Sequence, residues 1–267
     1  MGKVVFFDLD GTIVDSTNTI CSSAIRAIKA LRANGHKTGV ATGRSGFEMA
    51  SFMKRYAVDL FDIVLYNNGA QCEYNGDVLF RKCADPTEIA AIIQIARKNG
   101  IEYGTGSAYD WRFSVDYHPA MEKVINGHFL EIPNRCDPDY HIGREIFQGV
   151  LFTDLDTALR LCEPVLQQCE IVQGIMIGGG ISPHVDFWRR DLTKADGIRE
   201  VLGLLGSTME NCYAFGDGFN DIDMLKQAGM GVAMGNADPE VQKYADFVTK
   251  SIDEDGVEYA LKHFGLI

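Results

Sequence analysis

The chain begins with an apolar run that stops abruptly at two acids. Val4 to Phe7 are four hydrophobic residues, and Asp8, Asp10 and Gly11 follow them closely. Such a run is typical of a strand buried on both faces in a parallel sheet, and the glycine predicts that the chain turns away there. Ligands of open α/β sheets bind at the carboxyl ends of strands. Two neighbouring carboxylates repel each other, and a divalent cation such as Mg²⁺ would relieve the repulsion. An ordinary Asp-Gly turn is the alternative explanation.

The amino-terminal third continues with alternating helix and strand patterns. The expected elements are helices over 17–34 and 45–56 and strands over 37–41 and 63–66. This β-α-β-α-β order predicts a parallel sheet with helical crossovers. The same alternation returns late in the chain, so we expect an α/β fold whose Rossmann-like core consists of residues 1–82 and 185–267.

Residues 83–184 have a different pattern and predict an inserted α+β domain. Helix patterns at 86–99 and 154–168 are mixed there with strand patterns at 148–152 and 170–177. The run from His184 to Trp188 is expected to be the strand with which the core resumes. Polar candidates for substrate contacts are Asp110, Arg112, His118 and Arg135, although a place on the surface explains each of them better. The aromatic residues within 109–113 fit a strand that packs in a core better than a sugar-stacking platform.

Composition excludes several classes of partner. The 267 residues carry a net charge of −12, whereas nucleic-acid binding needs clustered Lys and Arg. No apolar run approaches the roughly 20 residues of a membrane span, and the first apolar run is too short for a signal peptide. Seven cysteines show no C-x-x-C pair and no zinc spacing. We therefore expect a cytoplasmic protein, a monomer or weak homo-oligomer, that binds a small molecule and neither nucleic acid nor membrane.

Chemically capable residues recur where predicted strands end and helices begin. They are Asp8, Asp10, Thr42, Lys194, Asp217, Asn220 and Asp221. Because all strands of a parallel sheet end at one edge, these side chains should converge. Carboxylates can hold a metal, while a hydroxyl, a lysine and backbone N–H groups can hold an anion, and that combination suits transfer of a phosphoryl group. The alternatives are structural: Thr42 as a helix cap, Lys194 as a solvated helix residue and Asp221 as a helix-start acid.

Four motifs in this order resemble those of the haloacid dehalogenase-like superfamily. They are FFDLDGT, ATGR, the lysine of DLTKADG, and GDGFND. The long insertion after the third strand, preceded by NNGA, and the closing run Asp253 to Val257 are similar to the Cof-type branch. That resemblance implies a Mg²⁺-dependent phosphatase with an α/β cap, and many members act on sugar phosphates. The resemblance covers the core residues. For the cap it extends only to size, position and type of element. The family usually has Lys-Gly where this chain has Lys194 and Ala195.

The resemblance also implies roles for individual residues. Asp8 would be the nucleophile and a Mg²⁺ ligand, forming an aspartyl-phosphate. Asp10 would protonate the leaving oxygen and then activate water, and its backbone carbonyl would bind Mg²⁺. Asp217 would be the other carboxylate on the metal, with Asp221 as a ligand or as a support through water.

The same resemblance implies a phosphate-binding set. The hydroxyl of Thr42 and the N–H groups of Gly43 and Leu9 would bind phosphoryl oxygens. Lys194 would neutralise charge on the nucleophile and the phosphate, and Asn220 would contact the phosphate side of the pocket.

Three other functions fit parts of the pattern. A phosphosugar mutase of the same superfamily would share the aspartyl-phosphate and return the phosphoryl group to its substrate. A signalling receiver also uses Asp, Thr and Lys around Mg²⁺, but its phosphorylated Asp lies on a later strand of a shorter chain. A non-catalytic sugar-binding protein would leave the dense carboxylate set without a purpose.

Overall fold

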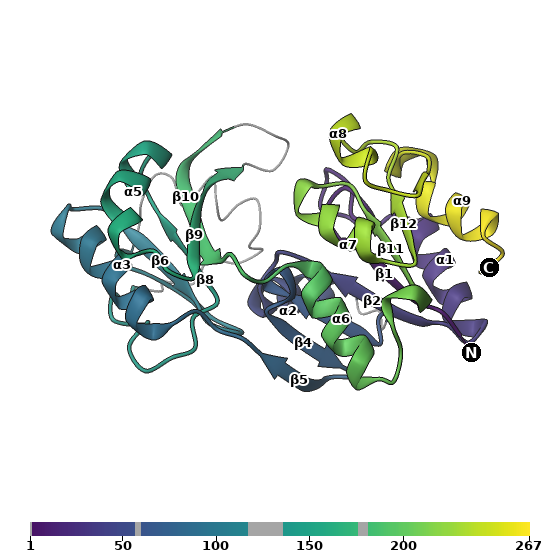
Figure 1. The fold of residues 1–267 in the computed structure, drawn as a ribbon, viewed down its shortest axis with the longest axis horizontal. Coiled ribbons are helices and arrows are strands. Elements are labelled where there is room, and N and C mark those ends of the chain that lie inside the picture. Colours follow the sequence, from purple (N-terminus) through teal and green to yellow (C-terminus); the bar gives the residue numbers. More distant parts are fainter. Residues whose placement is uncertain (1, 57–59, 117–135, 176–180) are drawn as a thin grey trace. The chain divides into compact units, whose positions relative to one another are not determined.

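The computed structural model describes residues 2–56, 60–116, 136–175 and 181–267, and it divides into two compact units (Figure 1). The first unit comprises Met1–Gly43, Asp59–Arg81 and Leu192–Ile267. The second comprises Arg44–Val58 and Lys82–Asp191. The second unit is therefore an insertion within the first, apart from the short stretch that begins at Arg44.

Within its described part, the first unit is built on a sheet of eight strands in the order β13-β12-β11-β1-β2-β3-β4-β5. The strands are β1 (Val4–Phe7), β2 (Lys37–Ala41), β3 (Ile63–Tyr66), β4 (Gln71–Tyr74), β5 (Asp77–Arg81), β11 (Cys212–Gly216), β12 (Met230–Ala233) and β13 (Phe247–Val248). From β13 to β3 all neighbours are parallel, whereas β4 and β5 add an antiparallel hairpin. The α/β class and the parallel core expected from the sequence are confirmed.

Helices cover the sheet of this unit. They are α1 (Ser22–Ala33), α6 (Lys194–Leu204), α7 (Ile222–Gln227), α8 (Pro239–Gln242) and α9 (Gly256–His263), with 3₁₀ turns η1 (Asn67–Gly69), η3 (Met209–Asn211), η4 (Phe219–Asp221) and η5 (Ile252–Glu254). The apolar residues of α6 pack with Phe6 and Leu65 in one buried cluster, while α1 and α9 lie side by side (Figure 1).

Helix α1 begins later than its apolar pattern predicts. The side chain of Asp15 accepts hydrogen bonds from the backbone N–H groups of Thr17 and Thr19. Asn18 between them has a left-handed φ of 59°. The side chain of Asp15 thus closes a turn over residues 15–19 and occupies backbone N–H groups there. The first residues of the predicted helix are therefore not helical.

The second unit contains an antiparallel sheet of five described strands in the order β7-β6-β8-β10-β9. They are β6 (Tyr103–Gly106), β7 (Trp111–Phe113), β8 (Gln148–Leu151), β9 (Cys169–Ile175) and β10 (Ile181–Arg189). Its described helices are α2 (Gly46–Tyr56), α3 (Pro86–Lys98), α5 (Leu155–Cys162) and the 3₁₀ turn η2 (Glu163–Val165).

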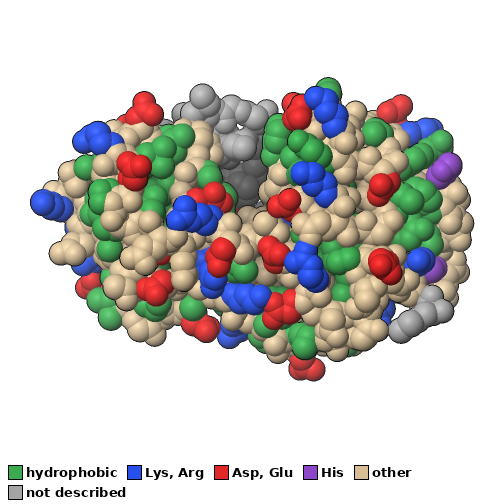
Figure 2. Space-filling view, in the orientation of Figure 1, with side chains coloured by type: hydrophobic (Ala, Val, Ile, Leu, Met, Phe, Trp, Pro, Cys, Tyr) green, Lys and Arg blue, Asp and Glu red, His purple; other side chains and the backbone are tan. Residues whose placement is uncertain are grey.

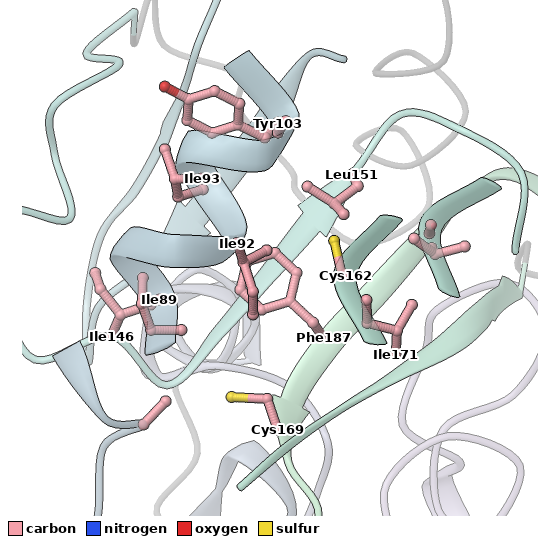
Figure 3. Close-up of a cluster of buried hydrophobic side chains, with 14 of the residues drawn as sticks. Ile89, Ile92, Ile93, Tyr103, Ile146, Leu151, Cys162, Cys169, Ile171 and Phe187 are labelled. Atoms are coloured by element: carbon pink, nitrogen blue, oxygen red, sulfur yellow. The ribbon is translucent and has the colours of Figure 1, made fainter. Parts of the chain in front are cut away.

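Strand β10 belongs to this second sheet and not to the core sheet that the sequence pattern suggested. It pairs antiparallel with both β8 and β9. Its Phe187 is fully buried among Ile92, Leu151 and Cys169 (Figure 3). An apolar alternation shows that a strand exists but not which sheet accepts it. The second unit consequently extends to Asp191, and the first resumes at Leu192.

Two of the three aromatic residues of 109–113 belong to the core of the second unit, whereas Tyr109 is 44% exposed. Trp111 and Phe113 are buried together with Val150 and Phe152, as their alternation predicts. Between them, Arg112 forms an ion pair of 3.0 Å with Asp110. The other two polar candidates, His118 and Arg135, lie outside the described residues.

Two surface properties bear on partners. Across the part of the chain that the structure describes, no helix is both long and apolar enough to cross a membrane. On the face shown in Figure 2, acidic and basic side chains are interspersed.

Candidate active site

Three adjacent strands of the first unit bring the predicted site residues to one edge. Strands β11, β1 and β2 are neighbours and run parallel. Asp217, Asp8 and Thr42 follow their carboxyl ends. Because parallel strands end at a common edge, side chains that are far apart in sequence meet there.

Lys194 is the centre of this arrangement. Its Nζ donates to Oδ1 of Asp8 at 2.5 Å and to Oδ1 of Asp221 at 2.6 Å. The lysine is only 1% exposed. A buried ammonium that bridges two buried carboxylates is not a solvated helix residue, so that alternative is excluded.

The start of α6 places this lysine. Thr193 caps the helix, because its hydroxyl accepts from the N–H of Asp196 while the carboxylate of Asp196 accepts from the backbone of Thr193. Lys194 is therefore the first helical residue, directly after a reciprocal capping box. Ala195 is fully buried in the cluster beneath the helix. Its methyl group packs there without displacing Lys194 from the carboxylates.

Asp221 has both carboxylate oxygens engaged by the protein. Oδ1 faces Lys194, and Oδ2 accepts from the backbone N–H groups of Asp217 and Gly218 at 3.0 and 2.8 Å. This side chain closes the loop after β11 and carries the negative charge opposite the lysine. The arrangement fits the supporting role better than direct contact with a metal.

Asp217 is held by two residues that the sequence analysis did not single out for this purpose. The hydroxyl of Thr12 donates to its Oδ1 at 2.9 Å. A Cβ on Gly11, whose φ is +85°, would lie 2.1 Å from Oδ2. The glycine and threonine that follow Asp10 therefore make room for Asp217 and orient it. Their place directly after the acid pair was the available signal.

Burial and mutual repulsion perturb the ionisation of these acids. Burial, followed by the charge of Asp221, raises the pKa of Asp8 well above its ordinary value. The same two causes raise the pKa of Asp217 to about 6. Burial alone would lower the pKa of Lys194, but Asp221 and Asp8 outweigh it and raise that pKa. Asp10 is exposed, and its charge adds to the rise at both Asp8 and Asp217.

These residues fit a divalent cation. Asp8, Asp217 and Asp221 each offer a carboxylate oxygen, and the three oxygens lie within 4.8 Å of one another. Among the described residues, Oδ2 of Asp217 has no hydrogen-bond partner, which leaves it available as a ligand. An all-oxygen donor set beside an anion site is what Mg²⁺ prefers.

Ser45 lies at the cap position of the helix that follows Thr42. Its hydroxyl accepts from the N–H of Glu48 at 3.3 Å, while its own N–H and hydroxyl donate to the carboxylate of Glu48 at 2.7 Å. Thr42 is 1% exposed. Its N–H donates to the carbonyl of Leu65, and its carbonyl accepts from the N–H of Asn68.

The remaining predicted contacts lie around the same edge of the sheet. Leu9 has a fully buried side chain, Gly43 is half-buried and Asn220 is exposed. The amide nitrogen of Asn220 donates to Oδ1 of Asn68 at 3.2 Å. Asn68 belongs to the NNGA segment and was not among the predicted site residues.

Known proteins resemble this chain over nearly its whole length. The sequence model of a family described as haloacid dehalogenase-like hydrolase matches residues 5–261. YkrA of Bacillus subtilis (strain 168), which carries the provisional name of a phosphatase, is 31% identical over 265 residues, covering 99% of this chain and 98% of its own. The 5-amino-6-(5-phospho-D-ribitylamino)uracil phosphatase YcsE of the same strain is 28% identical over 268 residues, covering 99% and 96%.

A solved structure agrees with these relatives. The chain aligns with the sugar phosphatase BT4131, of subclass IIB of the same superfamily, with a TM-score of 0.83. The two are 30% identical, and the alignment covers 99% of this chain and 100% of that one. Both the sequence and the fold therefore match hydrolases of phosphate esters over their full length.

Proposed function

Because this chain belongs to the haloacid dehalogenase-like hydrolase family and is a phosphatase, we propose that it hydrolyses small phosphomonoesters, sugar phosphates among them, through an aspartyl-phosphate on Asp8. The observation that carries the proposal is the buried bridge from Lys194 to Asp8 and Asp221, beside Asp217. It combines a nucleophile, a neutralising cation and metal-binding oxygens at the edge where α/β sheets bind ligands.

The first half of the reaction forms the covalent intermediate. A carboxylate oxygen of Asp8 attacks phosphorus, and the bond from phosphorus to the leaving oxygen breaks. Asp10 gives its proton to that oxygen. Thr42 and the N–H groups of Gly43 and Leu9 hold the phosphoryl oxygens while Lys194 offsets their charge.

The second half restores the enzyme. Asp10, now a carboxylate, removes a proton from water, and the hydroxyl oxygen attacks phosphorus. The bond between phosphorus and Asp8 breaks, so inorganic phosphate leaves and Asp8 is a carboxylate again.

Mg²⁺ is the cofactor that we propose. Asp8 and Asp217 would hold it, with the carbonyl of Asp10, while Asp221 orients the loop that carries Asp217. When bound, the cation would neutralise charge on the phosphate and the nucleophile.

The substrate class rests on relatives. BT4131 is named a sugar phosphatase, and the substrate in the name of YcsE carries its phosphate on a ribityl chain. Both esters are small and rich in hydroxyl groups. We assign the choice of leaving group to the second unit, acting as a cap, and catalysis to the first.

The decisive experiment measures phosphate release from a panel of sugar phosphates and other small monoesters, with Mg²⁺ and with a chelator. Wild type should release phosphate only with Mg²⁺. In Asp8→Asn the rate of phosphate release should fall by about a thousandfold or more. Asp223→Asn, a change of the same chemistry in α7, should keep wild-type activity. Full activity in excess chelator would refute the metal, and an active Asp8→Asn would refute the nucleophile. Transfer of phosphate within the sugar without release would favour the mutase.

A further inference from the structure

Asn68 spans two parts of the candidate phosphate site. Its Oδ1 accepts a hydrogen bond from the amide nitrogen of Asn220 at 3.2 Å. A Cβ placed on Gly43 would also lie close to this amide, 3.3 Å from Oδ1 and 3.6 Å from Nδ2 of Asn68. The amide of Asn68 therefore lies against Gly43 and reaches Asn220, the two positions expected to contact phosphoryl oxygens.

The backbone holds this amide in place. Asn68 has left-handed angles, φ 53° and ψ 37°, and its N–H donates to the carbonyl of Thr42 at 2.9 Å. The next residue, Gly69, also has a positive φ, and a Cβ there would lie 2.5 Å from the carbonyl oxygen of Thr193. The turn is thus tied to the Thr42 loop on one side and packed against the start of α6 on the other.

The hydrogen bond to Asn220 decides which way the amide of Asn68 faces. Because Oδ1 is the acceptor in that bond, Nδ2 and its two hydrogens point elsewhere. Across the described parts of the chain, no acceptor partner is found for this nitrogen. A half-buried amide donor beside the glycine of the expected phosphate-binding loop is in a position to donate a hydrogen bond to an anionic oxygen.

We propose that Asn68 is a further substrate-binding residue, which donates from Nδ2 to an oxygen of the phosphate ester held at Thr42 and Gly43. This inference rests on the proposed phosphatase function. It extends the binding set to a residue on η1, between the second and third motifs. The competing explanation is that Asn68 only positions Asn220.

Two substitutions separate these explanations. Asn68→Asp keeps an oxygen for Asn220 and tolerates the left-handed backbone, but it replaces the donor with a negative charge. Asn68→Gly removes the whole side chain and also tolerates a positive φ. If Asn68 donates to the ester, Asn68→Asp should impair binding more than Asn68→Gly does. If Asn68 only positions Asn220, Asn68→Asp should impair binding less than Asn68→Gly does.

The measurements are kcat and KM for a sugar phosphate and the affinity for inorganic phosphate by calorimetry. We expect Asn68→Gly to raise KM and weaken phosphate binding about tenfold. Asn68→Asp should weaken both about a hundredfold, because a carboxylate faces the anion. Asn75, in the turn between β4 and β5 and also left-handed with φ 51°, is the matched control. Asn75→Gly and Asn75→Asp should leave both constants unchanged.

Each other outcome overturns the inference. Wild-type phosphate affinity in Asn68→Asp with a loss in Asn68→Gly would assign Asn68 to positioning alone. Unchanged constants in both variants would remove it from the site. If wild type itself neither released nor bound phosphate, both the proposed function and the assignment of Asn68 would fail. That result can be told apart from an active wild type whose Asn68 variants have unchanged constants, which would overturn only the assignment of Asn68.

Discussion

Gly69 and Gly197 meet backbone to backbone: a Cβ on Gly197 would lie 2.7 Å from the Cα of Gly69. Gly69 follows β3, and Gly197 is in the first turn of α6. Their contact lets α6 approach the carboxyl edge of the sheet closely enough for Lys194 to reach Asp8. Two glycines without reactive side chains therefore help to set the position of the Lys194 ammonium.

Gly197→Ala should damage both stability and activity. The added methyl group has backbone on its far side and cannot be accommodated without moving α6. We expect a loss of about 1–3 kcal/mol in the free energy of unfolding and a fall in kcat, measured by denaturant titration and turnover.

The matched control lies in the same helix. A Cβ on Gly203 would meet nothing within 4 Å, so Gly203→Ala should stabilise the protein by about 0.5–1 kcal/mol through helix propensity. Equal effects of the two substitutions would show that the contact between Gly69 and Gly197 has no influence.

Lys194→Met should be strongly destabilising. It leaves the buried carboxylates of Asp8 and Asp221 without their cation, and removing one partner of a buried ion pair costs about 3–5 kcal/mol. Activity should also be lost, because nothing then neutralises the nucleophile and the phosphate. Chemical denaturation measures the first effect. Lys29→Met, at an exposed position of α1, should change stability little, and a similar small change at Lys194 would contradict the role of the bridge.

Asp10→Asn should slow turnover by about a hundredfold or more, because general acid–base catalysis contributes about 10²–10⁴-fold. Its two roles are separable by leaving group. An aryl ester with an acidic leaving group needs no protonation, so its first half-reaction should slow less than that of a sugar phosphate. Rapid-quench measurement of the covalent intermediate would show it accumulating from the aryl ester. An equal slowing for both esters, without accumulation, would remove both roles from Asp10.

Glu88→Gln should destabilise the second unit in a pH-dependent way. The buried carboxylate of Glu88 accepts from the backbone N–H groups of Gln167, Gln168 and Cys169 at 2.7, 2.9 and 2.9 Å. Burial alone would raise the pKa of Glu88, but these three donors outweigh it and lower the pKa below 4.5. We expect a loss of about 2 kcal/mol at neutral pH.

The sign of the pH dependence follows from the lowered pKa. Glu88 contributes its full stability above pH 4.5, and the contribution is lost as the pH falls through the lowered folded-state pKa. The difference between wild type and Glu88→Gln should therefore shrink in acid. Denaturant titrations across this range measure it, with the exposed Glu163→Gln as control. A difference that stayed constant or grew towards low pH would refute the assignment.

Local patterns in the sequence were sufficient to predict β1, which precedes Asp8, and its neighbouring strands β2 and β11. The run before Asp8, and the turns that follow β2 and β11, predict parallel strands from apolar periodicity and glycine alone. Because all such strands end at one edge, the convergence of Asp8, Thr42 and Asp217 could be expected before the structure was known. The order of the four motifs then indicated the family.

Only the tertiary structure decided which distant residues hold those acids and where the inserted unit ends. The bond from Thr12 to Asp217 joins positions 205 apart, and β10 joins the second sheet because Phe187 fills a cluster there. Nothing in the local sequence around Asn68 or Gly197 indicates what each contacts. Periodicity and propensity depend on residues that are close in sequence, so they indicate the local conformation of a segment. Close packing between two distant segments depends on the volumes and directions of the side chains of both segments.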